Sequence, residues 1–243
     1  MKKDGEIIHH HSGVAGFAEY AVLPKEALVR IDKHIPFEHA ALFGCGVVTG
    51  IGAVINTASA REEDSIAIVG LGGVGLSALL ASIAIGSKKT IAIDLSDEKL
   101  ALAKELGADH TLNPKDENFL EIFLDITSGG ANIAVETAGS GHALKTAYDI
   151  TRRGGTTVAA GMPGPKVEIT LSHLSIAAEE RIIKGSYMGS CIAHRDIPKY
   201  LDMFQTGKLP VDRLLSRKIT FEDLNAAMDR LDDAKTVREV LIP

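Results

Sequence analysis

The stretch that decides the fold lies between residues 65 and 94. Ser65-Ile-Ala-Ile-Val-Gly70 is a short β-branched run, and the glycine-rich segment Gly70-Leu-Gly-Gly-Val-Gly75 continues it. Thr90-Ile-Ala-Ile-Asp94 is a second run of the same kind. Both runs are typical of buried strands, and the apolar, small-residue segment 74–85 between them favours a helix. The stretch therefore predicts a β-α-β unit.

The glycine segment fits the pattern G-x-G-x-x-G, which is weak alone but specific between a strand and a helix. Gly70 permits a tight turn, Gly72 lets the backbone approach a pyrophosphate, and Gly75 lets the helix pack closely on the strand. The start of that helix presents free N–H groups and partial positive charge to phosphates. The candidate cofactor-binding residues of this segment are Gly70, Leu71, Gly72, Gly73, Val74 and Gly75.

Asp94 provides the second half of the dinucleotide-binding pattern. It ends the second predicted strand, 19 residues after Gly75. A carboxylate at this place accepts hydrogen bonds from the adenosine ribose and repels a 2′-phosphate, so NAD is predicted in preference to NADP. The alternative is a plain glycine turn followed by a solvated aspartate. Lys99 is close enough in sequence to reach the same ribose, although a solvated helix lysine is the simpler interpretation.

The rest of the chain continues the alternation of strands and helices. Further strands are predicted at 110–113, 133–138, 157–161 and 181–187, and helices at 97–106, 118–126 and 142–153, the last closed by two glycines at 154 and 155. This pattern favours an α/β fold with a doubly wound parallel sheet of six strands. We expect an NAD-binding domain over 49–186, and a second domain formed by both flanks, 1–48 and 187–243.

Composition narrows the classes of function. The chain has 243 residues, 45% of them hydrophobic and 24% charged, and a formal net charge of −6. The absence of a basic patch argues against a nucleic-acid partner. The most apolar stretch, Leu76–Ile85, is too short to cross a bilayer, so no membrane partner is expected. Two cysteines cannot form a disulfide framework, which favours a cytoplasmic protein.

Several ungapped segments in one order carry a family resemblance. They are Phe17-Ala-Glu-Tyr20, Gly44-Cys-Gly-Val-Val-Thr-Gly50, the segment 70–77, Lys104-Glu-Leu-Gly-Ala-Asp109 and Val237-Arg-Glu-Val-Leu241. Together they resemble the zinc-type alcohol dehydrogenases of the medium-chain dehydrogenase/reductase family over essentially the whole chain. The resemblance implies a six-stranded Rossmann sheet, with remnants of a mostly β, GroES-like catalytic domain contributed by both chain ends.

The resemblance also implies roles for single residues. Asp94 and Lys99 fall on adenosine-ribose positions, and Arg238 on an arginine that contacts the cofactor phosphates. Val74 and Thr49 fall on positions near the nicotinamide. Cys45 falls on the third ligand of a catalytic zinc, which polarises an alcohol or carbonyl oxygen while NAD exchanges the hydride. Cys45 and Thr49 are thus the candidate catalytic residues, and Cys45 the candidate metal ligand.

The sequence departs from the family pattern in its N-terminal part. The first zinc cysteine, the Gly-His-Glu motif with the second ligand, the proton-relay residues and the four-cysteine structural lobe have no counterpart, so we expect an N-terminally truncated chain with an incomplete zinc site. Without the family, Cys45 is more simply a buried thiol. His9-His10-His11 cannot all face one ion from a strand. Cys191 matches no ligand, and His142 is expected in a loop near the cofactor edge, without a catalytic role.

Three functions stay open. The first is an NAD-dependent zinc-type alcohol dehydrogenase acting on a small alcohol or aldehyde, in a homodimer or homotetramer. The second is a non-catalytic NAD-binding module or degenerate copy, which the missing ligands favour. A zinc-free quinone reductase is the weakest, because such enzymes usually lack a cysteine at position 45 and prefer NADPH. The substrate stays open among primary alcohols, aldehydes and thiol adducts of formaldehyde.

Overall fold

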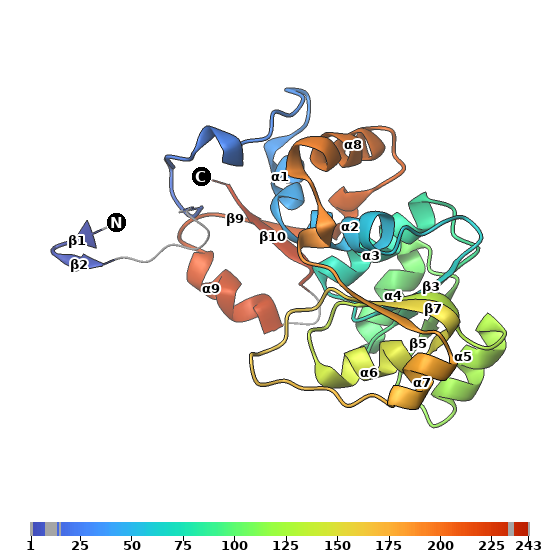
Figure 1. The fold of residues 1–243 in the computed structure, drawn as a ribbon. Helices are drawn as coiled ribbons and strands as arrows, with labels where there is room; N and C mark the ends of the chain where they lie inside the picture. Colours follow the sequence, from blue (N-terminus) through green and yellow to red (C-terminus); the bar gives the residue numbers. More distant parts are fainter. Residues whose placement is uncertain (1, 8–13, 15, 233–235, 243) are drawn as a thin grey trace.

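A six-stranded parallel sheet forms the centre of the computed structural model, which describes residues 2–7, 14, 16–232 and 236–242 (Figure 1). Its strands are β3 (Ser65–Val69), β4 (Lys89–Ile93), β5 (His110–Leu112), β6 (Ala131–Glu136), β7 (Thr151–Ala159) and β8 (Ile182–Gly185). They are ordered β5-β4-β3-β6-β7-β8, and every neighbouring pair is parallel. This is the doubly wound order, with the reversal between β3 and β6, so the predicted fold class is confirmed.

Helices cover both faces of the sheet, and the strand residues alternate between them. Ile66 and Ile68 belong to a core with α3 (Gly73–Ala84) and α4 (Asp97–Leu106). Ala67 and Val69 belong to a second core, with α5 (Phe119–Thr127) and α6 (Gly141–Asp149). Strands buried on both faces explain why the sequence shows continuous apolar runs in place of polar alternation.

Local signals in the sequence explain most helix ends. Ser96 caps α4 by accepting the Lys99 N–H, and the left-handed Gly107 ends that helix. The helix predicted over 142–153 is wrong at its end, because α6 stops at Asp149 and β7 begins at Thr151. The Thr151 hydroxyl bonds to the last turn of α6 and to Thr157, and the two glycines at 154 and 155 lie in an irregular part of β7, not in a helix cap.

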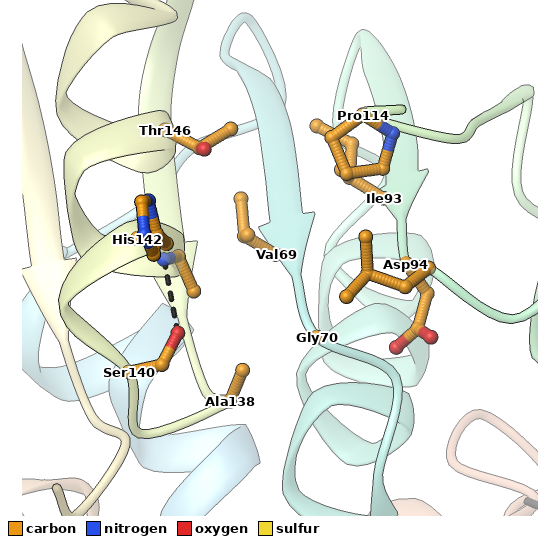
Figure 2. Close-up of a pocket in the computed structure, with 11 residues that line it drawn as sticks. Val69, Gly70, Ile93, Asp94, Pro114, Ala138, Ser140, His142 and Thr146 are labelled. Atoms are coloured by element: carbon orange, nitrogen blue, oxygen red, sulfur yellow. Dashed lines mark hydrogen bonds between the residues drawn. The ribbon is translucent and has the colours of Figure 1, made fainter. Parts of the chain in front are cut away.

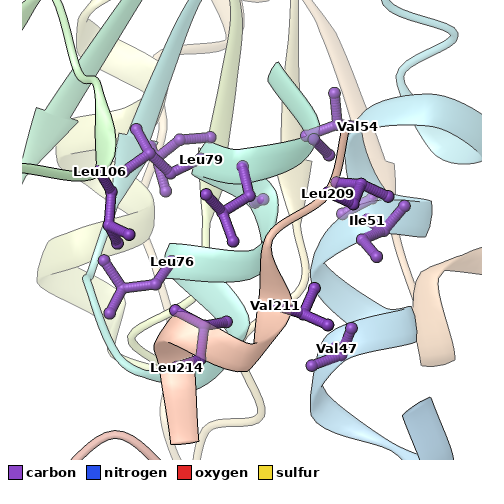
Figure 3. Packing of buried hydrophobic residues seen from close by; sticks show 14 of the residues in the cluster. Val47, Ile51, Val54, Leu76, Leu79, Leu106, Leu209, Val211 and Leu214 are labelled. Atoms are coloured by element: carbon purple, nitrogen blue, oxygen red, sulfur yellow. The ribbon is translucent and has the colours of Figure 1, made fainter. Parts of the chain in front are cut away.

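A second layer of helix packs against α3. α2 (Gly46–Gly52) continues into a π-helix, η3 (Ala53–Thr57), and the two lie beside α3 in one apolar core. Figure 3 shows Val47, Ile51 and Val54 of this helix facing Leu209 and Val211, which come from the C-terminal part of the chain. The core therefore joins segments from both sides of the glycine-rich stretch.

The C-terminal part has the predicted order of helix, strand, helix and strand. It contains α8 (Ala193–Gln205), η5 (Val211–Leu214), β9 (Leu215–Ile219), α9 (Leu224–Asp229), η6 (Arg230–Asp232) and β10 (Arg238–Leu241). β9 and β10 form a separate parallel pair. Between β7 and α8 lie α7 (His173–Ala178), the sheet strand β8, and η4 (Met188–Ser190).

The N-terminal part is less regular. β1 (Lys2–Lys3) and β2 (Glu6–Ile7) form a small hairpin, followed by η1 (Lys25–Ala27), α1 (Phe37–Ala40) and η2 (Ala41–Gly44). Between residues 16 and 36 the structure has no strand, and Tyr20 and Val22 are 91% and 99% exposed. In the described residues no single helix has the length and apolarity to cross a membrane. The bent pair Phe37–Gly44 with Gly46–Thr57 meets that test by length and composition only. The domain limits at 48 and 186 stay predictions.

Candidate functional site

The glycine segment forms a turn at the carboxyl end of β3. Gly70 has a φ of +94°, which a side chain would strain, and a Cβ on it would lie 2.8 Å from the backbone nitrogen of Ala138. The Thr137 hydroxyl donates to the Gly70 carbonyl oxygen at 2.7 Å. Thus the segment after β6 holds the turn after β3 at the point where the strand order reverses.

The start of α3 lies close to this turn. A Cβ on Gly75 would lie 1.8 Å from the Gly70 carbonyl oxygen, so only glycine permits the approach. Gly72 caps the helix, is exposed, and would have no atom within 4 Å of a Cβ. The first N–H groups of α3 therefore open onto free space, as an anion-binding helix start requires.

Asp94 follows β4 and reaches across to the glycine turn. One carboxylate oxygen accepts the Leu71 N–H at 2.6 Å, and the other accepts the Ser96 N–H at 2.9 Å. The side chain is half-buried. A carboxylate oxygen has room for more than one donor, so both oxygens can still accept hydroxyl groups from a ligand. The two backbone bonds fix the direction in which they point.

A cavity of about 520 Å³ opens beside Asp94 at the carboxyl ends of β3, β4 and β6 (Figure 2). Asp94 lies on one side of it and His142 on the other, with Val69 and Gly70 between them. Its remaining lining residues are Ile93, Leu95, Pro114, Ala138, Ser140, Ala143 and Thr146. A mostly apolar cavity with one carboxylate suits a flat heterocycle joined to a polyhydroxyl group.

Glu136, the last residue of β6, positions one wall of this cavity. Its side chain is 2% exposed, and its carboxylate accepts the Gly139 N–H at 2.5 Å and further backbone N–H groups from Ala138, Ser140 and Gly161. Burial raises the pKa of Glu136, while these N–H groups oppose that shift. Because Ala138 and Ser140 line the cavity, the buried carboxylate sets its shape.

Arg238 lies on the other side of the glycine segment. A Cβ on Gly46 would lie 2.0 Å from its guanidinium, and a Cβ on Gly73 would lie 2.2 Å from it, so the arginine is held between the starts of α2 and α3. Its Nη1 donates to the Val237 carbonyl oxygen, and burial lowers the pKa of its guanidinium. No salt bridge to Arg238 is present among the described residues. A buried cation beside two helix starts, without a carboxylate, fits an anionic ligand.

A groove of about 400 Å³ contains the Arg238 side of the site. Gly72, Gly73, Lys99 and Arg238 line it together with Phe17 and with residues from α9 and β10. Lys99 therefore lies in this groove, not in the cavity beside Asp94. The sequence-based assignment of Lys99 and Asp94 to the same ribose stays a prediction.

Cys45 and Thr49 lie at the start of α2. Cys45 is exposed and precedes Gly46, which contacts Arg238. Thr49 is 8% exposed, and its hydroxyl lies 2.9 Å from the Cys45 carbonyl oxygen and 3.8 Å from the Met188 sulfur. Val74 is half-buried, and its carbonyl oxygen faces Gly50 of α2. The two predicted nicotinamide neighbours, Thr49 and Val74, thus belong to two helices in contact.

The described part of the chain contains no group of three His, Cys, Asp or Glu side chains placed to hold a metal. Cys45 is one donor, and a zinc site needs three or four. Cys191 is a free thiol near Asp196, far from this role, and burial raises its pKa to about 11. His9, His10 and His11 lie outside the described residues. The residues present therefore do not form a complete zinc site.

Residues that the sequence analysis missed line or brace the site. Thr137, Ala138 and Ser140 follow β6, and Glu136 ends it. Polar and small residues directly after a parallel strand are a usable signal, because ligands bind at the carboxyl ends of such sheets. His142, assigned to a loop, is the second residue of α6 and lines the cavity.

Comparison with known proteins places the site in context. A family model described as zinc-binding dehydrogenase matches residues 73–206. The chain is 31% identical over 98% of its length to S-(hydroxymethyl)glutathione dehydrogenase of Paracoccus denitrificans, and 33% identical over 98% to alcohol dehydrogenase class-2 isozyme 2 of Oryctolagus cuniculus. A solved alcohol dehydrogenase zinc-binding domain protein of Burkholderia ambifaria matches 95% of this chain with a TM-score of 0.91 and 31% identity. The chain spans 66%, 63% and 62% of these three proteins, respectively.

Proposed function

Because the chain belongs to the zinc-binding dehydrogenase family, we propose that it binds NAD and serves hydride transfer between this cofactor and a small alcohol or aldehyde. One observation carries the proposal. The exposed start of α3, the Asp94 carboxylate and the guanidinium of Arg238 surround the same glycine segment, with a cavity on one side and a groove on the other. Each matches one chemical part of a dinucleotide.

The adenosine half fits the cavity beside Asp94. Both oxygens of this carboxylate are oriented by backbone N–H groups and keep acceptor capacity for the two ribose hydroxyls. A 2′-phosphate would bring negative charge next to a negative group, so we infer selection of NAD over NADP. The apolar residues of the cavity would surround the adenine ring.

The pyrophosphate fits the start of α3 next to Arg238. Its charge would neutralise a guanidinium that has no carboxylate partner in the described structure, and the N–H groups after Gly72 would hydrogen-bond to it. We infer that Lys99, in the same groove, adds charge or reaches the ribose. The nicotinamide would then lie on the side of Thr49 and Val74, where these residues would orient the ring.

When bound, NAD supplies the hydride acceptor, and the chain supplies binding and orientation. Cys45 is the one residue that we propose as a zinc ligand, by family position. Since one thiol does not make a zinc site, no step of the reaction is assigned to zinc. A cytoplasmic location, and assembly into a homodimer or homotetramer through the sheet edge near β8, are also proposals.

A second function has its own support. A non-catalytic NAD-binding module would need the cofactor site but no metal cluster, and the described residues contain none. Bound zinc together with alcohol-dependent reduction of NAD would exclude this alternative. NAD binding without zinc and without turnover would favour it.

The test is calorimetric titration of the chain with NAD and NADP, with zinc content measured on the same sample. We expect NAD to bind and NADP to bind at least about tenfold more weakly. Asp94→Asn keeps an oxygen for the Leu71 N–H but removes the charge, so it should weaken NAD and narrow the difference. Equal affinity of the unaltered chain for both cofactors would refute the assignment of Asp94, and binding of neither would refute the proposed function.

A further inference from the structure

The turn that follows β8 has an unusual backbone. Met188, Gly189 and Ser190 have φ values of 49°, 65° and 49°, so three consecutive residues are left-handed, and two of them are not glycine. Residues with side chains adopt this conformation at an energetic cost and keep it only where surrounding contacts determine it. The contacts around this turn therefore indicate what it is for.

One side of the turn lies against α2. A Cβ on Gly52 would lie 2.2 Å from the Gly189 carbonyl oxygen, and Gly189 has equally little room against the backbone of α2. The Met188 sulfur lies 3.8 Å from the Thr49 hydroxyl. The turn is thus seated on the helix that carries Thr49, with no space for a side chain between them.

Two consecutive residues of the π-helix η3 hold the other side. The Asn56 amide donates to the Gly189 carbonyl oxygen at 3.2 Å. The Thr57 hydroxyl lies 2.8 Å from the Ser186 hydroxyl and 2.9 Å from the Ser190 hydroxyl. The pair therefore bonds to the residue before the turn, to its middle and to its last residue. Single π-turns inside α-helices are frequent at functional sites.

Asn56 is itself fixed from behind. Its amide also donates to the Asp196 carboxylate at 3.2 Å, and that carboxylate accepts the Ile192 N–H at 2.8 Å and binds Arg195. The Asn56 side chain is in this way oriented by the start of α8. This arrangement is more than packing, because every polar group in it is directed toward the turn.

The turn lies at the carboxyl end of β8, on the same edge of the sheet as Gly70 and Thr137. A doubly wound sheet binds one mononucleotide over each of its halves, and the adenosine cavity lies over the half that contains β4 and β5. The half with β6, β7 and β8 remains for the other mononucleotide. The turn and Thr49 are at that end.

We propose that Asn56 and Thr57 are positioning residues, which hold the Met188–Ser190 turn against α2 as the wall of the site for the nicotinamide half of the cofactor. The inference rests on the proposed function, namely that the chain binds NAD. Neither residue needs to contact the cofactor, since both act through the turn.

The experiment compares two probes on the same variants. ADP-ribose contains the adenosine, pyrophosphate and second ribose but lacks nicotinamide, whereas NADH contains all of them. In calorimetric titrations, Asn56→Ala and Thr57→Val should each weaken NADH about tenfold, because a buried acceptor loses its donor or a strained turn its support. The affinity for ADP-ribose should stay within about twofold.

Two further variants separate positioning from folding. Thr57→Ser keeps the hydroxyl and should retain the affinity of the unaltered chain for NADH. Asn132→Ala is the matched control, because Asn132 joins Ser65 of β3 to β6 at the opposite, amino-terminal end of the sheet. It should lower the melting temperature and leave both affinities unchanged.

The outcomes discriminate between the inference and the proposed function. If NADH and ADP-ribose weaken together in Asn56→Ala and Thr57→Val, or neither weakens, the positioning role is refuted while NAD binding stands. Equal affinity of the unaltered chain for both probes refutes it as well, because the turn then adds nothing. If the unaltered chain binds neither probe, the proposed function fails and the inference with it.

Discussion

Replacing Gly50 by alanine tests whether the close contact between α2 and α3 holds the cofactor site. A Cβ on Gly50 would lie 2.1 Å from the Val74 carbonyl oxygen and 2.8 Å from both the Ala78 nitrogen and the Ser77 Cβ. Ordinary contact begins at about 3.4 Å, so the two helices would have to separate by about 1.3 Å. The strain falls on the first turn of α3, next to the glycine segment.

The magnitude follows from two opposing effects. Alanine in place of glycine favours a helix by about 1 kcal/mol. Overpacking a close contact costs about 3 kcal/mol. The net loss of unfolding free energy is therefore about 2 kcal/mol, which for a chain of this length lowers the melting temperature by roughly 4–8 °C. We also expect weaker NAD binding, because the N–H groups at the start of α3 move with the helix.

The assay is thermal unfolding followed by circular dichroism, with and without NAD. Gly44→Ala is the matched control, because a Cβ on Gly44 would meet no atom within 4 Å, and its melting temperature should not fall. A melting temperature of Gly50→Ala equal to or above that of the unaltered chain would contradict the reasoning. It would mean that α2 and α3 separate without cost.

Three further predictions concern charges and thiols. Arg238→Met should abolish most of the rise in melting temperature that NAD causes, while leaving the cofactor-free protein at least as stable, because it removes a buried cation without a carboxylate; a scanning fluorimetry shift equal to that of the unaltered chain would contradict it. Asp196→Asn should cost about 2 kcal/mol at pH 7, since the hydrogen-bonded Arg195 holds the pKa of Asp196 at about 2, against about 3.9 in an unfolded chain. A depressed pKa stabilises above pH 4 and that stability is lost as pH falls from 4 to 2, so the difference between the variant and the unaltered chain in urea unfolding should close over that range, and a constant difference would refute the assignment. In brief alkylation at pH 8 followed by mass spectrometry, the exposed Cys45 should react before Cys191, whose pKa burial raises to about 11; equal rates would show that Cys191 is not protected.

The part of the fold that the sequence predicted well depends on neighbours in the chain. The β3 strand, the glycine turn and the first turn of α3 are contiguous, and each residue type has a local reason to be there. Asp94 could be found because a βα unit has a narrow range of lengths. Ser96 as the cap of α4 follows from the same kind of local chemistry.

Contacts between distant segments were not predictable in this way. That Arg238 lies between Gly46 and Gly73 depends on β10 pairing with β9, which no local pattern indicates. The family resemblance alone suggested a role for that arginine. The helix predicted through residue 153 fails for a related reason, since a paired strand starting at Thr151 overrides the helical pattern.

The left-handed turn at Met188 and Ser190 had no signal in the sequence. These residue types seldom adopt positive φ, and the support comes from Asn56 and Thr57, more than 130 residues earlier. In a helix that is otherwise apolar, two polar residues read only as a break in its pattern. Their function became visible once the structure brought the two segments together.

The position of Arg238 in the chain has a consequence for synthesis on the ribosome. The glycine segment ends at Gly75, and Arg238 is made 163 residues later. At a translation rate of 5–20 residues per second, roughly 8–33 s separate the two. During that interval the nascent sheet can form a nucleotide cavity whose phosphate end has no arginine. A cofactor that needs Arg238 for its affinity would then bind only to molecules whose β10 has left the ribosome and paired with β9, so its binding would report that translation has passed through β10.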